Sequence, residues 1–387
     1  MTQPDRVDVP MSVWASGQPI TVARWPDRRH LLDGTTPMVR TTMRQILLSS
    51  MAVGRPVLNL LLQHPEFAVS ELRVRVESLR AGLALRRLPS GAQVAAISSW
   101  LAQAADPTER GAFGYRIGMA MADWATVQML GVASTRHVSG LPSHDPRRAR
   151  LGQPDLYGKH EWAGPKQWVI EAKGGTRVTA SRRYEGAAQV NTGWSSPHVQ
   201  ALISSAVDPL LHVVVELGLP VSGRAPAGVQ DVDHWPLRSG ERHGPGPLDA
   251  FLRGVLLATV LRSENADVVW LRGHPTRVVA LTDLDVSVGM REAVFEQVAA
   301  VIEELREALM PLGIAQREPP HLLVEAALSV ARRALPSAAH DVAPTGRTDL
   351  FEMDDPVRLA AASPDGLIVL LGPSWVPENR YSPVQER

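Results

Sequence analysis

The chain contains no cysteine among its 387 residues. Disulfide bonds, thiolate zinc sites, iron–sulfur clusters and cysteine nucleophiles are therefore all excluded. A metal ion could be held only by carboxylate, histidine or carbonyl groups. Such a ligand set favours a hard cation such as Mg²⁺ or Mn²⁺.

The sequence also lacks a long apolar run. A membrane-spanning helix needs roughly 18–20 consecutive apolar residues, and the most apolar stretch, 201–217, is interrupted by Asp208 and Pro209. The N-terminal sequence MTQPDRVDVPMSVW has neither the basic start nor the apolar core of a secretory signal peptide. We therefore expect a cytoplasmic protein that does not bind a membrane.

Net charge is absent as well, because 40 Lys and Arg balance 40 Asp and Glu. The charge is unevenly distributed, however, and residues 136–190 hold ten basic side chains against five acidic ones. A local basic surplus is typical of phosphate recognition, although charge runs are more often plain solvated surface. Six arginines in this segment are candidates for nucleic-acid contacts: Arg147, Arg148, Arg150, Arg177, Arg182 and Arg183.

The patterning predicts an N-terminal all-helical module over residues 1–105. Prolines are scattered through its first 35 residues, which we expect to be irregular. Helical spacing of apolar residues then predicts helices at 38–51, 57–63, 68–85 and 91–105. Such a module could support a homodimer or dock a partner protein.

Residues 106–285 carry a different pattern, in which helices and short strands alternate. It predicts helix 108–130, strands 134–138, 153–157 and 167–172, helix 181–192 and strand 211–217. A glycine- and proline-rich loop at 221–248, helix 247–261 and strands 267–271 and 277–281 follow. Residues 286–387 form a C-terminal α+β region with helices 291–312 and 321–334 and strand 366–371. We predict an α/β (α+β) fold with a mixed sheet flanked by helices.

The chemistry is concentrated in two of these strands. Asp155 lies in the segment QPDLY, and Glu171 and Lys173 lie in WVIEAKGG. Because side chains alternate along a strand, Glu171 and Lys173 project from the same face. If the two strands form a hairpin, Asp155 comes within reach of both. Two carboxylates could then hold a divalent cation beside a lysine.

These residues resemble the PD-(D/E)xK phosphodiesterase superfamily, which includes restriction endonucleases. Pro154-Asp155 matches the PD element and Glu171-Ala172-Lys173 matches the (D/E)xK element. The resemblance spans residues 108–217 and implies a restriction endonuclease-like core in the order helix, three strands, helix, strand. It implies a Mg²⁺- or Mn²⁺-dependent endonuclease that cleaves DNA, as in restriction or anti-phage defence, with Asp155, Glu171 and Lys173 as catalytic residues.

The resemblance suggests two further site residues. The family often places an acid on the first core helix, and Asp123 is the candidate metal ligand because an unpaired carboxylate in so apolar a helix is costly to bury. An exposed Asp123 is the alternative, and Glu109 is the competing acid. Several branches carry a glutamine on the second helix, where Gln189 lies, and the resemblance implies a catalytic role for it, in which it bonds a phosphate or a metal-bound water. Gln189 could equally be a surface residue.

One alternative to the enzyme stays open. The nuclease-like fold could serve as a non-catalytic scaffold for nucleic-acid binding or assembly. The presence of Asp155, Glu171 and Lys173 together favours the enzyme.

Overall fold

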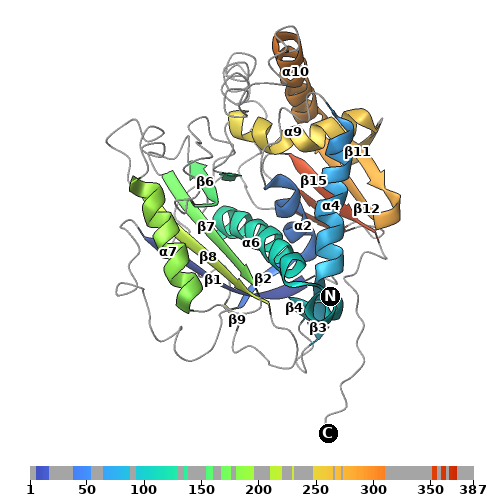
Figure 1. Cartoon of the computed structure of the whole chain (residues 1–387). Coiled ribbons are helices and arrows are strands. Elements are labelled where there is room, and N and C mark those ends of the chain that lie inside the picture. The colour runs from blue at the N-terminus through green and yellow to red at the C-terminus, as the bar shows by residue number, and fades with distance from the viewer. Residues whose placement is uncertain are drawn as a thin grey trace.

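The computed structural model describes residues 6–16, 38–53, 64–87, 93–129, 135–137, 154–159, 167–175, 180–195, 210–219, 229–230, 247–264, 266–271, 273–309, 351–354, 359–362 and 366–372. These residues form a mixed α/β structure with one mixed sheet, one antiparallel sheet and helices packed on both (Figure 1). The coarse α/β prediction is therefore confirmed. No helix within these ranges is long and apolar enough to cross a membrane.

The mixed sheet contains the predicted hairpin and extends well beyond it. Its strand order is β3 (Leu83–Arg87), β4 (Gln93–Ile97), β1 (Arg6–Ser16), β8 (Leu210–Gly218), β7 (Gln167–Gly175), β6 (Leu156–Lys159) and β5 (Thr135–His137). Two shorter strands lie off this path. β2 (Met38–Thr42) pairs with β1, and β9 (Val229–Gln230) pairs with β2. β5, β6 and β7 pair antiparallel, whereas β7 and β8 run parallel. A crossover helix must therefore join β7 to β8.

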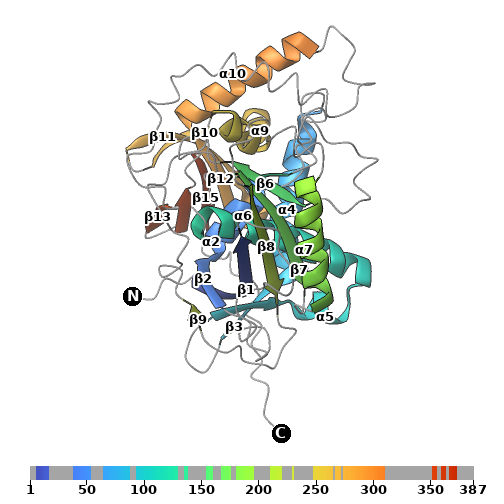
Figure 2. The same ribbon diagram turned by 90° about the vertical axis from the view of Figure 1, so that its left-hand side faces the viewer.

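Two helices cover opposite faces of this sheet (Figure 2). A Cβ atom on Gly118 of α6 (Pro107–Met129) would meet the backbone of Gly174 in β7. A Cβ atom on Gly186 of α7 (Ala180–Ser195) would instead meet the side chains of Glu171 and Lys173. Since alternate residues of a strand face opposite ways, α6 covers one face of β7 and α7 covers the face that carries the acid and the lysine.

The contact between α6 and β7 depends on glycine. A Cβ atom on Gly174 would lie 1.9 Å from the carbonyl oxygen of Gly114. We expect Gly174→Ala to lower the free energy of unfolding by about 1–3 kcal/mol or more, because overpacking forces the backbone apart. Gly111→Ala is the matched control on α6, since nothing lies within 4 Å of its added methyl group. Urea denaturation should show a destabilised Gly174→Ala and an unchanged or stabilised control; equal stabilities would contradict the close approach.

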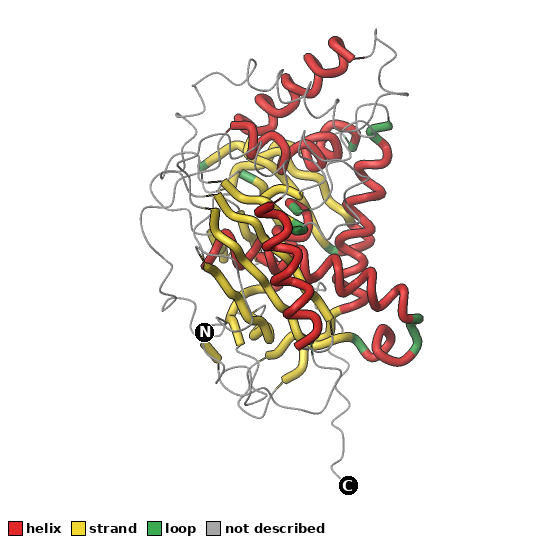
Figure 3. The backbone as a smooth tube through the Cα atoms, turned by 60° about the vertical axis from the view of Figure 1, so that its left-hand side comes forward, coloured by secondary structure: helices red, strands yellow, loops and turns green. Residues whose placement is uncertain are grey.

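The second sheet is antiparallel throughout. Its order is β10 (Asp267–Leu271), β11 (His274–Leu281), β12 (Val286–Arg291), β15 (Leu367–Leu371), β14 (Leu359–Ala362) and β13 (Phe351–Asp354). The remaining helices are α2 (Met43–Ala52), α4 (Glu66–Gly82), α5 (Ser99–Gln103), α9 (Pro247–Ser263) and α10 (Glu292–Leu309), with a short 3₁₀ turn at Thr282–Leu284. Figure 3 shows the helices gathered along and above the two sheets. One hydrophobic core extends from β1 and α6 to β15 and α10.

The prediction of an all-helical N-terminal module is wrong. Strands β1 to β4 all lie within the first 105 residues, and β1 occupies the middle of the mixed sheet. The scattered prolines predict an irregular chain over residues 6–16, which instead form a strand. Pro10, however, lies where β1 changes partner: Pro10 is the last residue paired with β2, and Met11 is the first paired with β8. Proline has no backbone N–H group to donate, and this loss destabilises a sheet least where the strand changes partner.

Three predicted N-terminal helices are also partly strand. Residues 38–42 are β2 before α2 begins, the predicted helix 68–85 ends in β3, and residues 93–97 are β4 before the short α5. The pairing of strands crosses both predicted domain boundaries, since β1 pairs with β8 and β11 pairs with β12. The elements predicted between 108 and 217 agree with α6, β5, β6, β7, α7 and β8 to within a few residues. The predicted helices 57–63 and 321–334 lie outside the described residues.

Candidate active site

The hairpin of β6 and β7 places Asp155 opposite Glu171. Leu156 pairs with Ile170 in the antiparallel register, so Asp155, one residue before β6, lies across from Glu171. The backbone N–H of Ala172 donates a hydrogen bond to Asp155 Oδ2 over 3.0 Å. This bond fixes the carboxylate at the end of the hairpin. The two acids therefore lie on the same face of the sheet, as the strand alternation predicts.

Lys173 and Gln189 complete the cluster. Lys173 Nζ lies 2.6 Å from Glu171 Oε1 and also donates a hydrogen bond to Gln189 Oε1. Gln189 comes from α7, whose Gly186 allows the helix to lie directly over the acid and the lysine. The structure thus brings together the four residues predicted to be catalytic.

The electrostatics of the cluster are dominated by burial. Glu171 is 1% exposed, and this burial raises its pKa well above the usual 4.5, with the negative charge of Asp155 adding to the rise. Burial likewise raises the pKa of Asp155, while the hydrogen bond from Ala172 and the charge of Lys173 act in the opposite direction. One lysine does not compensate the buried Glu171 and the partly buried Asp155 together. The pair therefore has a strong affinity for a proton or for a cation.

The residues present fit a hard divalent cation. The buried Oε2 atom of Glu171 has no hydrogen-bond partner within the described part of the chain. That orphaned oxygen and the Asp155 carboxylate would hold Mg²⁺ or Mn²⁺. Among the described residues no group of three or more acidic or histidine side chains is gathered at one place. Mg²⁺ commonly takes only one or two protein carboxylates, with water and phosphate oxygens completing its shell.

Asp123, predicted as a third metal ligand, has other partners. Arg253 Nη1 and the Thr135 hydroxyl group each donate a hydrogen bond of 2.6 Å to Asp123 Oδ1. Asp123 and Arg253 are both buried, and their ion pair ties α6 to α9. The carboxylate is buried because it is paired, so its burial gives no reason to assign it a metal. The competing acid, Glu109, accepts a hydrogen bond from the N–H of Asp106 as part of the cap that begins α6.

The predicted nucleic-acid contacts are only partly described. Arg182 is exposed on α7, and its Nη1 donates a hydrogen bond of 2.9 Å to the carbonyl oxygen of Gly174 at the end of β7. Arg183 belongs to α7, and the position of its side chain is not described. Arg147, Arg148, Arg150 and Arg177 lie outside the described residues. Arg182 is thus the candidate for which the structure provides a position, close to the strand that carries Glu171.

Sequence reasoning missed Arg253. It is 130 residues from Asp123 along the chain, and no local pattern connects the two. A long-range ion pair of this kind leaves no periodic signal in the sequence.

The raised pKa of Glu171 predicts a pH-dependent stability in the absence of metal. Between the usual value of 4.5 and the raised value, the folded protein holds a proton that the unfolded chain has released. The contribution of this proton to the free energy of unfolding is fully present below pH 4.5. It is lost as the pH rises through the raised pKa. In EDTA, the midpoint of thermal unfolding should therefore fall as pH rises above 5, and Mg²⁺ should restore it.

Glu171→Gln removes this titration and is the variant that tests it. Its melting temperature should depend less on pH than that of the wild type, whereas the exposed-acid control Glu264→Gln should follow the wild type. Identical pH profiles for Glu171→Gln and the wild type would contradict the burial effect.

No protein-family model, curated protein or solved structure matched the chain.

Proposed function

We propose that the chain is a Mg²⁺- or Mn²⁺-dependent endonuclease that hydrolyses DNA phosphodiester bonds with a PD-(D/E)xK type of active site. The order of elements supports this assignment, because α6, β5, β6, β7, α7 and β8 follow one another as in that superfamily. The parallel pairing of β7 with β8 and the antiparallel hairpin of β6 and β7 agree with a mixed sheet of this kind.

One observation carries the proposal. The buried carboxylate of Glu171 and the partly buried carboxylate of Asp155 lie beside Lys173, whose single positive charge does not balance both. Burying uncompensated charge costs several kcal/mol per ion, so such an arrangement is retained where a cation or a reaction requires it. A structural ion pair would need only Glu171 and Lys173. The second acid is what distinguishes a metal centre from an ordinary surface pair.

The roles of the side chains follow from their positions. A bound Mg²⁺ would supply Lewis acidity toward a phosphate oxygen and lower the pKa of a water ligand. Asp155 and Glu171 would hold it. The Lys173 ammonium group, next to the acids, would offset negative charge that develops on the phosphate. Gln189 accepts a hydrogen bond from Lys173 Nζ and therefore orients the ammonium group.

DNA as the substrate is part of the proposal. The sequence around the acidic pair, residues 136–190, holds ten basic side chains against five acidic ones, and the exposed Arg182 lies against the end of the strand that carries Glu171. Phosphate contacts from such residues position a duplex without reading its bases. Restriction or defence against phage would be a natural use of the activity, and a homodimer would allow both strands to be cut.

The test is a cleavage assay on supercoiled plasmid, linear duplex, single-stranded DNA and RNA, with Mg²⁺, Mn²⁺ or EDTA. We expect nicking or linearisation of plasmid in Mg²⁺ and Mn²⁺ and none in EDTA. Binding to DNA without cleavage under any of these metal conditions would favour the alternative, a non-catalytic scaffold. Cleavage that persists in EDTA would contradict the metal site.

A further inference from the structure

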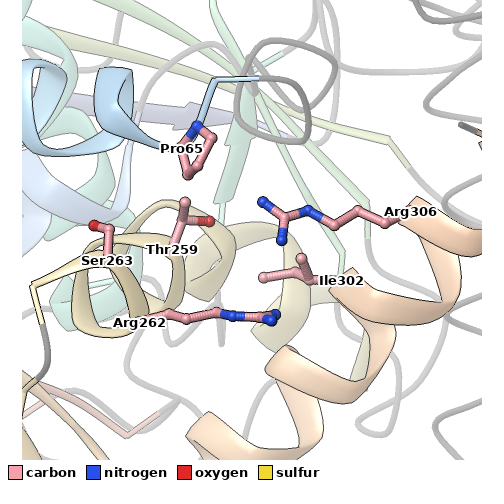
Figure 4. Close-up of a pocket in the computed structure, with 6 residues that line it drawn as sticks. All are labelled: Pro65, Thr259, Arg262, Ser263, Ile302 and Arg306. Carbon is pink, nitrogen blue, oxygen red and sulfur yellow. The ribbon is translucent and has the colours of Figure 1, made fainter.

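A pocket lies where α4, α9 and α10 meet, and none of the acidic pair's residues line it. Its volume is about 180 Å³, and it is lined by Pro65, Thr259, Arg262, Ser263, Ile302 and Arg306. In Figure 4 the side chains of Arg262 and Arg306 extend toward each other from α9 and α10, and Pro65 and Thr259 lie across from the Arg306 guanidinium group. The described lining contains two cationic side chains and no acid.

The two guanidinium groups share one carboxylate. Arg262 forms an ion pair with Glu303 Oε1, and Arg306 Nη1 lies 3.4 Å from the same oxygen. Two guanidinium groups thus share one carboxylate as their ion-pair partner. A simple ion pair between α9 and α10 would require only Arg262 and Glu303. Arg306 is therefore not required for this contact between α9 and α10.

Arg306 has an unused hydrogen-bond donor. Its Nε atom is buried and finds no hydrogen-bond partner among the described residues. A buried charged donor without an acceptor destabilises the fold, because it has lost water and gained no partner. An anion that enters the pocket could accept a hydrogen bond from this donor and pair with both guanidinium groups.

The other polar groups near the pocket already have partners. Pro65 is the N-cap residue of the 17-residue helix α4, whose first turn carries the acid Glu66. The N–H groups of Phe67 and Ala68 donate to the carbonyl oxygens of His64 and Pro65. The hydroxyl groups of Thr259 and Ser263 donate to carbonyl oxygens of their own helix. The guanidinium groups are therefore the donors that an anion would meet.

The size of the pocket restricts the ligand. Sites for whole drug-sized molecules have volumes of roughly 300–1,000 Å³, so about 180 Å³ suits a small anion or one group of a larger ligand. Arginine pairs match the oxygen geometry of phosphate, and the guanidinium fork binds it by two parallel hydrogen bonds.

We propose that this pocket is a phosphate-binding site, in which Arg262 and Arg306 hold the phosphate group of a small phosphorylated ligand or of a nucleic-acid 5′ end. The site is independent of the proposed cleavage activity, because it uses none of the residues around Glu171. Its occupation would bridge α4, α9 and α10 and so stabilise their contact.

The test is isothermal titration of the full chain with inorganic phosphate in EDTA, at constant ionic strength in chloride. We expect saturable binding that weakens at least about tenfold, the equivalent of 1.4 kcal/mol, in Arg306→Met and in Arg262→Met. Arg116 is exposed on α6, outside the pocket, and the control variant Arg116→Met should bind phosphate like the wild type. Ser263→Glu should abolish binding by placing a carboxylate at the lining, whereas Ser263→Gln, of equal size, should retain it.

The opposite results would overturn the proposal. Absence of phosphate binding at 10 mM or more, or equal affinities for the wild type and Arg306→Met, would do so even if DNA cleavage were observed. The Ser263 pair keeps the test valid if an arginine variant fails to fold. Titration with matched oligonucleotides, with and without a 5′-phosphate, then identifies the source: a pocket-dependent preference for the phosphorylated strand indicates a nucleic-acid end, and its absence indicates a small phosphorylated ligand.

Discussion

Glu171→Gln is expected to lower the rate of Mg²⁺-dependent DNA cleavage by about a thousandfold or more. A metal ion lowers the barrier by several kcal/mol, and every 1.36 kcal/mol corresponds to a factor of ten in rate. Glutamine keeps the size of the side chain but removes the charge that holds the cation. Asp155→Asn should have a similar effect, since the asparagine carbonyl can still accept the hydrogen bond from the N–H of Ala172. Initial rates of plasmid nicking measure both.

The design of this experiment separates loss of metal from loss of fold. In EDTA, Glu171→Gln should be at least as stable as the wild type at neutral pH, because it removes a buried charge next to Asp155. Its stability should gain little from Mg²⁺, whereas the wild type should gain much. Glu264, an exposed carboxylate directly after the end of α9, provides the control, and Glu264→Gln should cleave normally. Wild-type cleavage by Glu171→Gln would remove this residue from the site.

Lys173→Ala distinguishes the lysine from the metal ligands. The ammonium group touches Glu171 Oε1 and Gln189, and its proposed role is to act on the phosphate rather than to bind the cation. The variant should therefore still be stabilised by Mg²⁺ while losing most of its turnover. A cleavage rate equal to that of the wild type would exclude the lysine from the mechanism.

The second large effect concerns stability. Asp123→Ala is expected to reduce the free energy of unfolding by about 3–5 kcal/mol, because it leaves the buried Arg253 without its counter-ion. The Thr135 hydroxyl group would also lose its acceptor. Replacing both members, as in Asp123→Leu with Arg253→Met, should cost much less than either single change, since no charge is then left uncompensated. Urea denaturation of the single and double variants gives the coupling energy.

An exposed pair of the same residue types provides the control. Arg73 and Asp283 join α4 to the turn before β12, with 40% and 49% of their side chains exposed. Asp283→Ala should cost at most about 1 kcal/mol, as solvent screens such pairs. If Asp123→Ala were no more destabilising than Asp283→Ala and instead abolished stabilisation by Mg²⁺, the carboxylate would be a metal ligand after all.

The candidate site was predictable because its signals are local. Glu171 and Lys173 are two residues apart in a strand, and the alternation of side chains alone puts them on one face. The short hairpin then brings Asp155 opposite Glu171, as the register of β6 and β7 shows. Helical and extended periodicities also located α6, α7 and β8, because each of these elements buries apolar side chains on at least one face. These features depend on residues close together in the chain.

The place of β1 depended on tertiary structure, although a signal was present. Val7, Val9, Met11 and Val13 alternate with more polar residues, but scattered prolines outweigh this pattern. Only the pairing with β2 on one side and β8 on the other shows that Pro10 falls at a junction where its missing N–H group is tolerated. Strand pairing is a contact between distant segments, so a window along the sequence cannot decide it.

The partners of buried charges were decided in the same way. Asp123 looked like a metal ligand because an apolar helix offers it no counter-ion, and Arg253, which neutralises it, comes from α9. The pocket at Arg262 and Arg306 likewise exists only where three helices converge. Local periodicity determines which face of an element is buried. The free energy of burying a charge or leaving a cavity depends on what packs against that face, and only the folded chain supplies that neighbour.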